Sequence, residues 1–329
     1  MPKFLKDDLP LFENIIQDLF PGIEKPKIDY GKLIDSVVST AKKSKLQPCK
    51  PFLEKVMQLY DTIQVRHGLM LVGPTGGGKT SVYKTLAGGM TSLAKEGQFK
   101  VHLHILNPKS IKIPSQLYGD YNESTHEWSD GILAYTVREC VKDQSVEKHW
   151  IMFDGPVDAL WIESMNTVLD DNKKLCLNSG QILTLTPHMT MMFEVEDLAV
   201  ASPATVSRCG MVYIEPQALG VEVLFDSWYE SIPANIAGNA KIMHRIKEMK
   251  SIFIEPIIRL LRINLKEVVS TMDNNICQSL MRIVDSFFVQ FTETEIKKIT
   301  PEEMQVLEES IENIYIFAVI WSLCCTVTF

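Results

Sequence analysis

The sequence predicts two domains, an α/β domain with a mostly parallel sheet over residues 1–218 and an all-helical domain over residues 219–329. Short apolar runs alternate with helical patterns as far as Glu215-Pro216, which is typical of a parallel sheet. Beyond that point, apolar residues recur only at helical spacing. The length of 329 residues also favours two domains, because single cores stop growing near ~250–300 residues.

The strands of the first domain are expected where short apolar or alternating runs end at turn residues. These runs are Leu69–Val72, Val101–Leu106, Trp150–Phe153, Thr190–Phe193 and Met211–Ile214. Helices are expected between them, with a hairpin around Asn178-Ser179-Gly180; the segments are Ser81–Leu93, Gly131–Val141, Asp158–Leu169 and the hairpin Leu175–Leu185. Before the first strand, residues 1–66 predict loops and amphipathic helices punctuated by proline.

The second domain is expected to be built from helices at Val221–Ser231, Ile252–Val269 and Ile276–Phe291. The uncharged stretch Ile314–Phe329 is shorter than the roughly 20 residues that a membrane-spanning helix needs. We therefore expect a buried helix there rather than a tail anchor. The abrupt end inside an apolar stretch suggests a chain cut from a longer protein.

Composition excludes several classes of function. The formal net charge of -8 argues against broad binding to nucleic acid or to a membrane surface, although a phosphate site needs only local positive charge. Seven cysteines, an odd number without a C-x-x-C pair, indicate a reducing compartment such as the cytoplasm. Zinc is not expected, because no Cys or His group shows ligand spacing. His102 and His104 share one strand face, where a polar sheet edge explains them better than a metal does.

Residues 73–80 match G-x-x-x-x-G-K-[ST] completely, between a predicted strand and a predicted helix. Glycines let backbone N–H groups surround phosphate oxygens, and the following helix points its positive end at the anion. Lys79 is expected to reach the β- and γ-phosphates, and the Thr80 hydroxyl to bind Mg²⁺. The strand–helix context disfavours the alternative of a plain glycine-rich turn. The sequence therefore predicts an ATP or ADP site formed by Gly73, Pro74, Thr75, Gly76, Gly77, Gly78, Lys79, Thr80 and Ser81.

A second metal carboxylate is expected at the end of another strand, and Asp154 directly follows Trp150–Phe153. Alone, Asp154 would be interpreted as a helix cap; with the phosphate loop upstream, we favour Mg²⁺ coordination. Hydrolytic P-loop machines of the D-E type place Glu directly after this Asp to orient the attacking water, whereas Gly155 and Pro156 follow here. Asp158 lies four positions on, where it could cap a helix. The sequence therefore predicts a site that holds ATP and hydrolyses it poorly or not at all.

Several long motifs occur in order along the chain. They are Met152–Leu175, Leu117–Gly119 with Glu127–Gly131, and Ala201–Met211. Together they resemble the second AAA+ module of dynein heavy chains, and the resemblance runs from near Met1 to about Val327. The segment Gly155–Ala159 is most similar to axonemal, inner-arm heavy chains.

The resemblance implies an AAA+ P-loop NTPase large domain followed by a helical small, or lid, domain that looks truncated. It implies a module of a motor ring in the cytoskeleton of a ciliary or flagellar axoneme. The implied partners are neighbouring modules of the same heavy chain, with microtubules and other dynein chains reached only through the full-length motor. Neither nucleic acid nor a membrane is expected as a partner. In this family the second module binds ATP structurally, while the first module is the main hydrolytic site.

The resemblance also gives Arg208 a role. Taken alone, Arg208 is interpreted as a surface or capping arginine; by resemblance it is an arginine finger that reaches the γ-phosphate in the first module's site. Glu194 departs from the family, which usually carries a polar sensor such as Asn at this strand end. A carboxylate there repels a γ-phosphate unless it is directed away, so we expect it to position a water or to pair with the loop of Arg208. The candidates for a sensor arginine in the lid are Arg245, Arg259, Arg262 and Arg282.

Three functions are compatible with these patterns. The first is an ATP-binding regulatory module of a dynein motor. The second is a free-standing P-loop ATPase that uses another carboxylate as its base, and the third is a scaffold that has lost its nucleotide. The intact phosphate loop argues against the scaffold, and Gly155 argues against the free-standing ATPase. Neither a microtubule-binding stalk nor a linker is visible, so the chain alone cannot be a motor.

Overall fold

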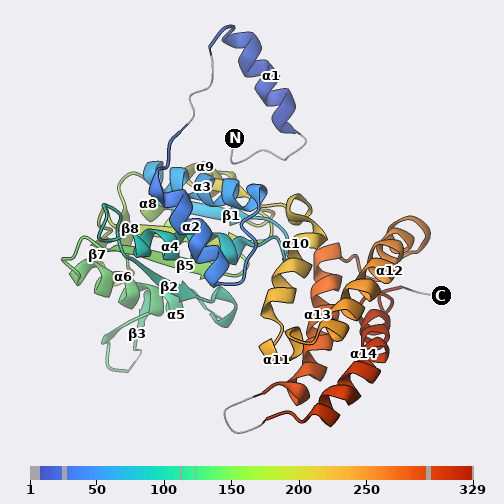
Figure 1. The fold of residues 1–329 in the computed structure, drawn as a ribbon. Helices are drawn as coiled ribbons and strands as arrows, with labels where there is room; N and C mark the ends of the chain where they lie inside the picture. The colour runs from blue at the N-terminus through green and yellow to red at the C-terminus, as the bar shows by residue number, and fades with distance from the viewer. Residues whose placement is uncertain (1–7, 24–27, 112, 123, 294–297, 328–329) are drawn as a thin grey trace. The chain divides into compact units, whose positions relative to one another are not determined.

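The computed structural model describes residues 8–23, 28–111, 113–122, 124–293 and 298–327 (Figure 1). The chain divides into two compact units, one formed by Met1–Ser44 with Pro48–Ala218 and the other by Lys45–Gln47 with Leu219–Phe329. Each unit has its own hydrophobic core. Among the described residues, no helix is both long enough and apolar enough to cross a bilayer.

A five-stranded sheet forms the centre of the first unit, in the order β2-β5-β8-β1-β9. All its neighbouring strands are parallel. Their bounds are β1 Gly68–Val72, β2 Val101–Leu106, β5 Lys148–Asp154, β8 Met189–Val195 and β9 Gly210–Tyr213. The five predicted strands and the parallel sheet are confirmed. Because parallel strands end at the same edge, the segments that follow β1, β5 and β8 meet there.

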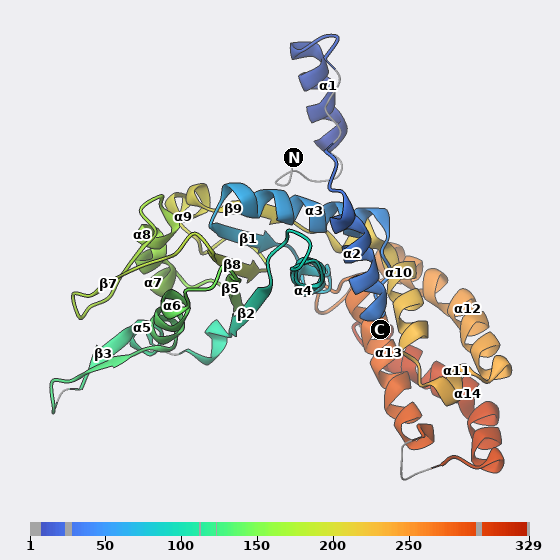
Figure 2. The ribbon, with the colours of Figure 1, turned by 60° about the vertical axis from the view of Figure 1, so that its left-hand side comes forward.

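Helices cover both faces of this sheet (Figure 2). One face carries α2 (Lys32–Lys43), α3 (Lys50–Val65) and α4 (Lys79–Ser92). The other carries α5 (Pro114–Tyr118), α6 (Ile132–Lys142), α7 (Ala159–Ile162) and α8 (Asn166–Leu169). A further helix, α1 (Leu9–Leu19), contains no buried residue. The layers arise because alternate residues of each buried strand point to opposite faces, and both faces are apolar.

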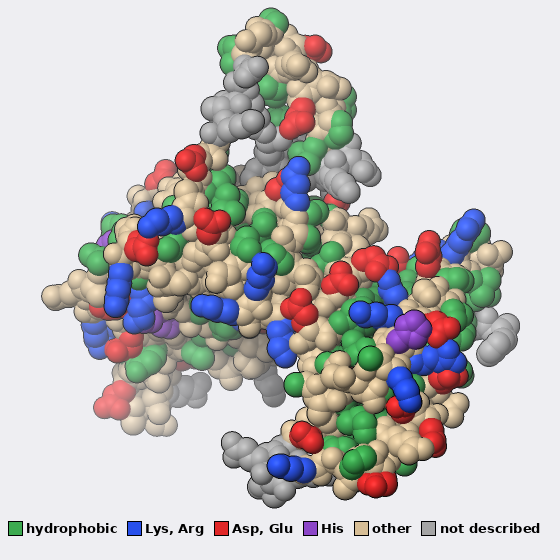
Figure 3. Space-filling model, in the orientation of Figure 1, with side chains coloured by type: hydrophobic (Ala, Val, Ile, Leu, Met, Phe, Trp, Pro, Cys, Tyr) green, Lys and Arg blue, Asp and Glu red, His purple; other side chains and the backbone are tan. Residues whose placement is uncertain are grey.

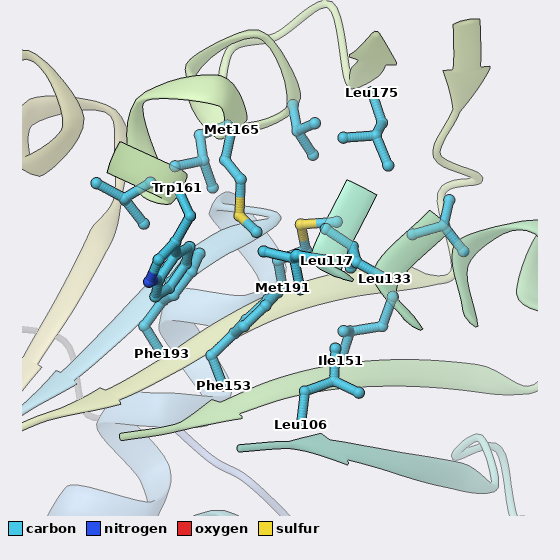
Figure 4. Close-up of a cluster of buried hydrophobic side chains, with 14 of the residues drawn as sticks. Leu106, Leu117, Leu133, Ile151, Phe153, Trp161, Met165, Leu175, Met191 and Phe193 are labelled. Carbon is cyan, nitrogen blue, oxygen red and sulfur yellow. The ribbon is translucent and has the colours of Figure 1, made fainter. Parts of the chain in front are cut away.

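The core under α7 is built around stacked aromatic rings (Figure 4). The rings of Phe153 on β5 and Phe193 on β8 lie 4.9 Å apart, and Trp161 of α7 stacks on Phe153 at 5.4 Å. Phe153 and Phe193 are fully buried. Since Asp154 and Glu194 each follow one of these rings in register, the stack fixes the ends of β5 and β8.

The segment predicted as one helix at Asp158–Leu169 is instead three short pieces, α7, the 3-10 helix η3 (Glu163–Met165) and α8. The Tyr118 hydroxyl donates to the carbonyl of Trp161, which a continuous helix would use for its own hydrogen bond. The predicted hairpin is confirmed as β6 (Lys174–Cys176) paired with β7 (Ile182–Thr184). Elements that the pattern missed are the hairpin β3 (Gly119–Tyr121) with β4 (Trp128–Asp130), the 3-10 helix η2 (Pro108–Ser110) and α9 (Pro203–Arg208).

The second unit is helical, apart from one isolated bridge between Glu267 and Val327 within its described residues. Its elements are α10 (Pro216–Ser231), α11 (Ala234–Ala237), α12 (Ala240–Asn264), α13 (Asp273–Phe288), η4 (Val289–Phe291) and α14 (Pro301–Ser322). The segment α10 contains a break at Gly220, where φ is 75° and ψ is 166°. Acidic and basic side chains are interspersed on the surface in view, without a large field of one sign (Figure 3).

Two expectations for the helical unit are corrected. The predicted helix Ile252–Val269 begins earlier, because the Asn239 side chain caps α12, and it ends at Asn264. The stretch Ile314–Phe329 is helical only as far as Ser322, and residues 328–329 lie outside the described part. Its helical part is buried on one side only, with Phe317 and Trp321 exposed.

Candidate functional site

The phosphate loop connects β1 to α4 at the carboxyl edge of the sheet, as its motif predicts. Gly73 follows β1 directly, and a Cβ added there would lie 2.0 Å from the backbone oxygen of Ile214. Gly78 precedes α4 with φ at 85°, a left-handed conformation that side chains resist. The loop therefore lies against the main chain that leaves β9, in a cradle only glycine fits.

Lys79 occupies the first position of α4 and is 7% exposed. Its Nζ donates to the carbonyl oxygens of Gly73 at 2.6 Å and Pro74 at 3.0 Å. Burial lowers the pKa of Lys79, and the carboxylates of Glu194, Glu196 and Asp154 oppose that shift. Carbonyl dipoles and nearby carboxylates thus stabilise the positive charge of Lys79 inside the loop, where the motif needs a cation.

Thr80 and Glu194 form a direct contact between α4 and the end of β8. The Thr80 hydroxyl lies 2.7 Å from Oε1 and 2.9 Å from Oε2 of Glu194, to which it donates. Burial raises the pKa of the Glu194 carboxyl, the bond from Thr80 opposes the rise, and the nearby Asp154 adds to it. The expectation that Glu194 pairs with the loop of Arg208 is wrong, because its carboxylate is directed at Thr80.

Asp154 ends β5 beside Glu194, to which it is paired in register, and its side chain is exposed. A hydroxyl and two carboxylates therefore gather at one point, and oxygen donors of this kind are the ligands that Mg²⁺ prefers. With Lys79 and the glycine cradle alongside, the residues present fit a Mg²⁺–nucleotide. Ser81, the next residue of α4, is half-buried, and Thr75 is exposed at the tip of the loop.

Gly155 occupies the position where a catalytic Glu would stand. Its N–H donates to the carbonyl of Glu194 at 3.3 Å. Its φ is 156°, and an added Cβ would lie 3.2 Å from Cδ of Pro108. A residue larger than glycine would therefore be strained at this position, and the sequence has none there. Asp158 lies immediately before α7, and its carbonyl accepts from the Ile162 N–H, as a helix start requires.

Arg208 is the last residue of α9. Its Nε donates to the carboxylate of Asp170, and its Nη1 donates to the Ala204 carbonyl at 2.9 Å. The next strand, β9, begins at Gly210 and runs parallel to β1. Arg208 therefore lies at the amino edge of the sheet, whereas the phosphate loop lies at the carboxyl edge. The fold does not bring Arg208 to the phosphate loop of its own unit.

Tyr83 is a site neighbour that sequence reasoning missed. It lies one turn after Lys79 on α4, is fully buried, and its hydroxyl has no hydrogen-bond partner among the described residues. Burial raises the pKa of Tyr83, and the charges of Glu194 and Asp154 raise it further. The only sequence signal was its spacing of four from Lys79, which is also typical of core packing.

The candidate sensor arginines differ in their surroundings within the helical unit. Arg245 pairs with Glu248 and Glu312, and Arg262 pairs with Glu267 and Asp273. Arg259 and Arg282 are exposed. The ion pairs give Arg245 and Arg262 a structural role in holding helices and connections of this unit together.

Three family models match the chain. "Hydrolytic ATP binding site of dynein motor region" matches residues 1–80, "AAA domain (dynein-related subfamily)" matches residues 68–209, and "Dynein heavy chain AAA lid domain" matches residues 246–328. The last two matches leave residues 210–245 between them, a stretch that contains β9, α10 and α11.

Curated relatives agree with these matches. Dynein axonemal heavy chain 1 of Homo sapiens is 47% identical over 333 residues, which is 99% of this chain and 8% of the relative. Dynein axonemal heavy chain 3 of Homo sapiens is 42% identical, again over 99% of this chain and 8% of the relative. Dynein axonemal heavy chain 6 of Homo sapiens is 52% identical over 70% of this chain and 6% of the relative. The chain thus spans less than a tenth of the length of these relatives, and it belongs to the axonemal dynein heavy chain family as an AAA+ module with its helical lid.

Proposed function

We propose that this chain binds Mg²⁺–ATP as the second module of an axonemal dynein ring and hydrolyses it very slowly or not at all. The observation that carries the proposal is the pairing of an intact phosphate site with glycine at the position of the catalytic carboxylate. The cradle around Lys79 is complete, whereas Gly155 follows Asp154. Binding and hydrolysis depend on different residues, so one can be kept without the other.

Binding is assigned to the loop Gly73–Ser81. Backbone N–H groups of the loop and of the first turn of α4 would surround the phosphate oxygens, with the helix dipole favouring the negative charge. The Lys79 ammonium, now on the carbonyls of Gly73 and Pro74, would turn to the β- and γ-phosphates. Thr80 and Asp154 would hold Mg²⁺, which supplies charge neutralisation for the phosphates.

Glu194 is suited to holding ATP rather than cleaving it. Its two oxygens already accept from the Thr80 hydroxyl, so the carboxylate is oriented towards the metal side of the site. The match to the hydrolytic-site model covers residues 1–80 and therefore stops before Asp154, Gly155 and Glu194. That match covers the phosphate loop and the helices before it, and it does not include the positions that govern hydrolysis.

Arg208 is proposed to act on the adjacent, hydrolytic module as an arginine finger. Its position at the opposite sheet edge from the phosphate loop supports a role outside its own unit. The ion pair with Asp170 also supports this role. It holds the half-exposed guanidinium in one orientation and leaves other N–H donors of Arg208 available for a phosphate. In the same proposal the chain acts within the axoneme, and the full-length heavy chain supplies the contacts with microtubules and other dynein chains.

Replacing Lys79 with Ala is expected to abolish ATP binding. Loss of a charge-assisted contact of about 3 kcal/mol or more corresponds to a loss of at least ~100-fold in affinity. Calorimetry of the purified chain measures this, with Lys95→Ala as a control for an exposed lysine just beyond α4. Equal ATP affinity in wild type and Lys79→Ala would reject the phosphate site.

ATP bound to the chain is expected to persist unchanged in a single-turnover assay. No carboxylate stands at Gly155 to take a proton from the attacking water. Gly155→Glu is expected to leave turnover unrestored, because its Cβ would press on Pro108. Rapid hydrolysis that survives purification and disappears in Lys79→Ala would favour a free-standing ATPase that uses another carboxylate.

Glu194→Gln is expected to raise the melting temperature of the nucleotide-free chain at pH 7. Burial raises the folded pKa of Glu194 above its ordinary value, so ionisation costs stability above that folded pKa and the cost disappears as the pH falls through it. The gain from glutamine should therefore shrink towards acidic pH. Each kcal/mol gained corresponds to a rise of ~2–4 °C in a domain of this size. The exposed Glu163→Gln, away from Lys79, is the matched control, and a gain that grows at acidic pH would contradict the assignment.

Arg208→Ala in the full-length heavy chain is expected to leave binding at Gly73–Ser81 nearly unchanged and to lower the steady-state ATPase strongly. Arginine fingers contribute ~10³–10⁵ in rate in the best-studied phosphoryl transfers. Arg208→Lys should rescue little, because a point charge lacks the planar fork of donors. Arg138→Ala, which removes an ion pair with Asp130 in the same unit, is the control for lost local stability. Wild-type turnover in Arg208→Ala would exclude the finger.

A further inference from the structure

A second group of ligand side chains lies on the face of the sheet that α6 covers. His104 comes from the edge strand β2, His149 from the start of β5, and Cys140 from α6. Figure 2 labels these three elements. Cys140 and His149 are buried and His104 is half-buried. On β5, His149 lies five residues before Asp154, or roughly 16 Å along the strand. The group is therefore separate from the phosphate site.

The separations within this group match those in a tetrahedral zinc site. Zinc binds His nitrogen at about 2.0–2.1 Å and Cys sulfur at about 2.3 Å, which places two nitrogens ~3.3 Å apart and nitrogen and sulfur ~3.6 Å apart. Nε2 of His104 lies 3.2 Å from Nδ1 of His149 and 3.5 Å from Sγ of Cys140. All the ligand atoms lie within 4.8 Å of one another. Two edges of the triangle thus have the required length, and the third closes with a small movement of side chains.

One of these ligands, His149, has a carboxylate behind it. Nε2 of His149 lies 3.0 Å from Oδ2 of Asp143, so its N–H donates there and leaves the lone pair of Nδ1 directed at His104. His102 stacks on His149 at 5.2 Å and pairs with Glu147. A carboxylate behind a ligating histidine orients the ring and strengthens its basicity, and it is the usual outer partner of a zinc ligand.

A metal needs a neutral imidazole and a thiolate at this group. Burial lowers the pKa of His104, with His149 and His102 adding to the shift, which favours the neutral ring. Burial raises the pKa of Cys140, the charges of Asp143 and Glu139 add to the rise, and together they bring it to about 11, so zinc would have to displace the thiol proton. Binding would break the Cys140 S–H bond, form a sulfur–zinc bond and release the proton to solvent.

We propose that His104, Cys140 and His149 bind a zinc ion, with a solvent molecule as the fourth ligand beside the half-buried His104. One sulfur and two imidazole nitrogens favour zinc over Mg²⁺ or Ca²⁺, which prefer oxygen. The ion would join the edge strand β2 to β5 and α6. The competing explanation is a metal-free hydrogen-bond chain from Asp143 through His149 and His104 to Cys140, and the experiment distinguishes the two.

The test uses the purified 329-residue chain, stripped of metal with a chelator and titrated with Co²⁺ as a coloured zinc substitute. Wild type should bind one equivalent with a thiolate-to-cobalt absorption band, and Zn²⁺ should displace it even in excess Mg²⁺. Cys140→Ser should lose the band, and His104→Asn should weaken binding strongly. Asp143→Asn, which alters only the outer partner, should weaken zinc binding ~10–100-fold. Zinc should raise the melting temperature of wild type but not of Cys140→Ser.

Exposed cysteines provide the controls. Cys176→Ser, and Cys324→Ser with Cys325→Ser, should keep the band and the affinity of wild type, because these thiols are exposed and lie outside the group. Circular dichroism establishes that each variant is folded, and His104→Asn tests the site without altering the buried thiol. Equal cobalt binding by wild type, Cys140→Ser and His104→Asn, or a band lost only with the exposed cysteines, would overturn the proposal.

Discussion

The buried ammonium of Lys79 is the interaction on which the arrangement of the site depends. A cation removed from water costs free energy unless dipoles or opposite charges surround it, and both are present here. The Gly73 and Pro74 carbonyls accept from it, while Glu194, Glu196 and Asp154 supply negative charge. The last three come from the ends of β5 and β8, so the parallel sheet is what brings them to the loop after β1. Binding of a nucleotide at this edge would give Lys79 phosphate oxygens as anionic partners in place of the carboxylates.

The same edge explains how binding can be separated from hydrolysis. The proposed metal side consists of Thr80, Asp154 and Glu194, and the stacked rings of Phe153 and Phe193 hold the strand ends that carry the two carboxylates. The water side would depend on position 155, which carries no side chain and where an added Cβ would lie 3.2 Å from Cδ of Pro108. The end of β5 thus combines a proposed metal ligand, Asp154, with the absence of a side-chain base after it. In a ring of modules, a site of this kind would report the presence of nucleotide without consuming it.

Much of the fold followed from local signals. The phosphate loop, the five strands and the hairpin at β6 and β7 were predictable because each depends on residues adjacent in the chain. The break in the helix at 158–169 was not, since it occurs where the Trp161 carbonyl accepts from the hydroxyl of Tyr118, a residue far upstream. The bonds between Thr80 and Glu194 and between Arg208 and Asp170 likewise join residues distant in sequence. No spacing along the sequence indicated that His104, Cys140 and His149 lie together. The order of the strands in the sheet and the helix that packs across them bring these side chains together.

Gly220 constrains the backbone at the start of the helical unit by its torsion angles. It lies at the start of the helical unit, within α10, with φ and ψ in a region that essentially only glycine occupies. An added Cβ would meet nothing within 4 Å, so crowding plays no part there. The constraint is torsional, and a side chain would act by shifting the preferred backbone angles of this one residue. A side chain at residue 220 would therefore be strained by its own torsion angles alone, without contact with either hydrophobic core.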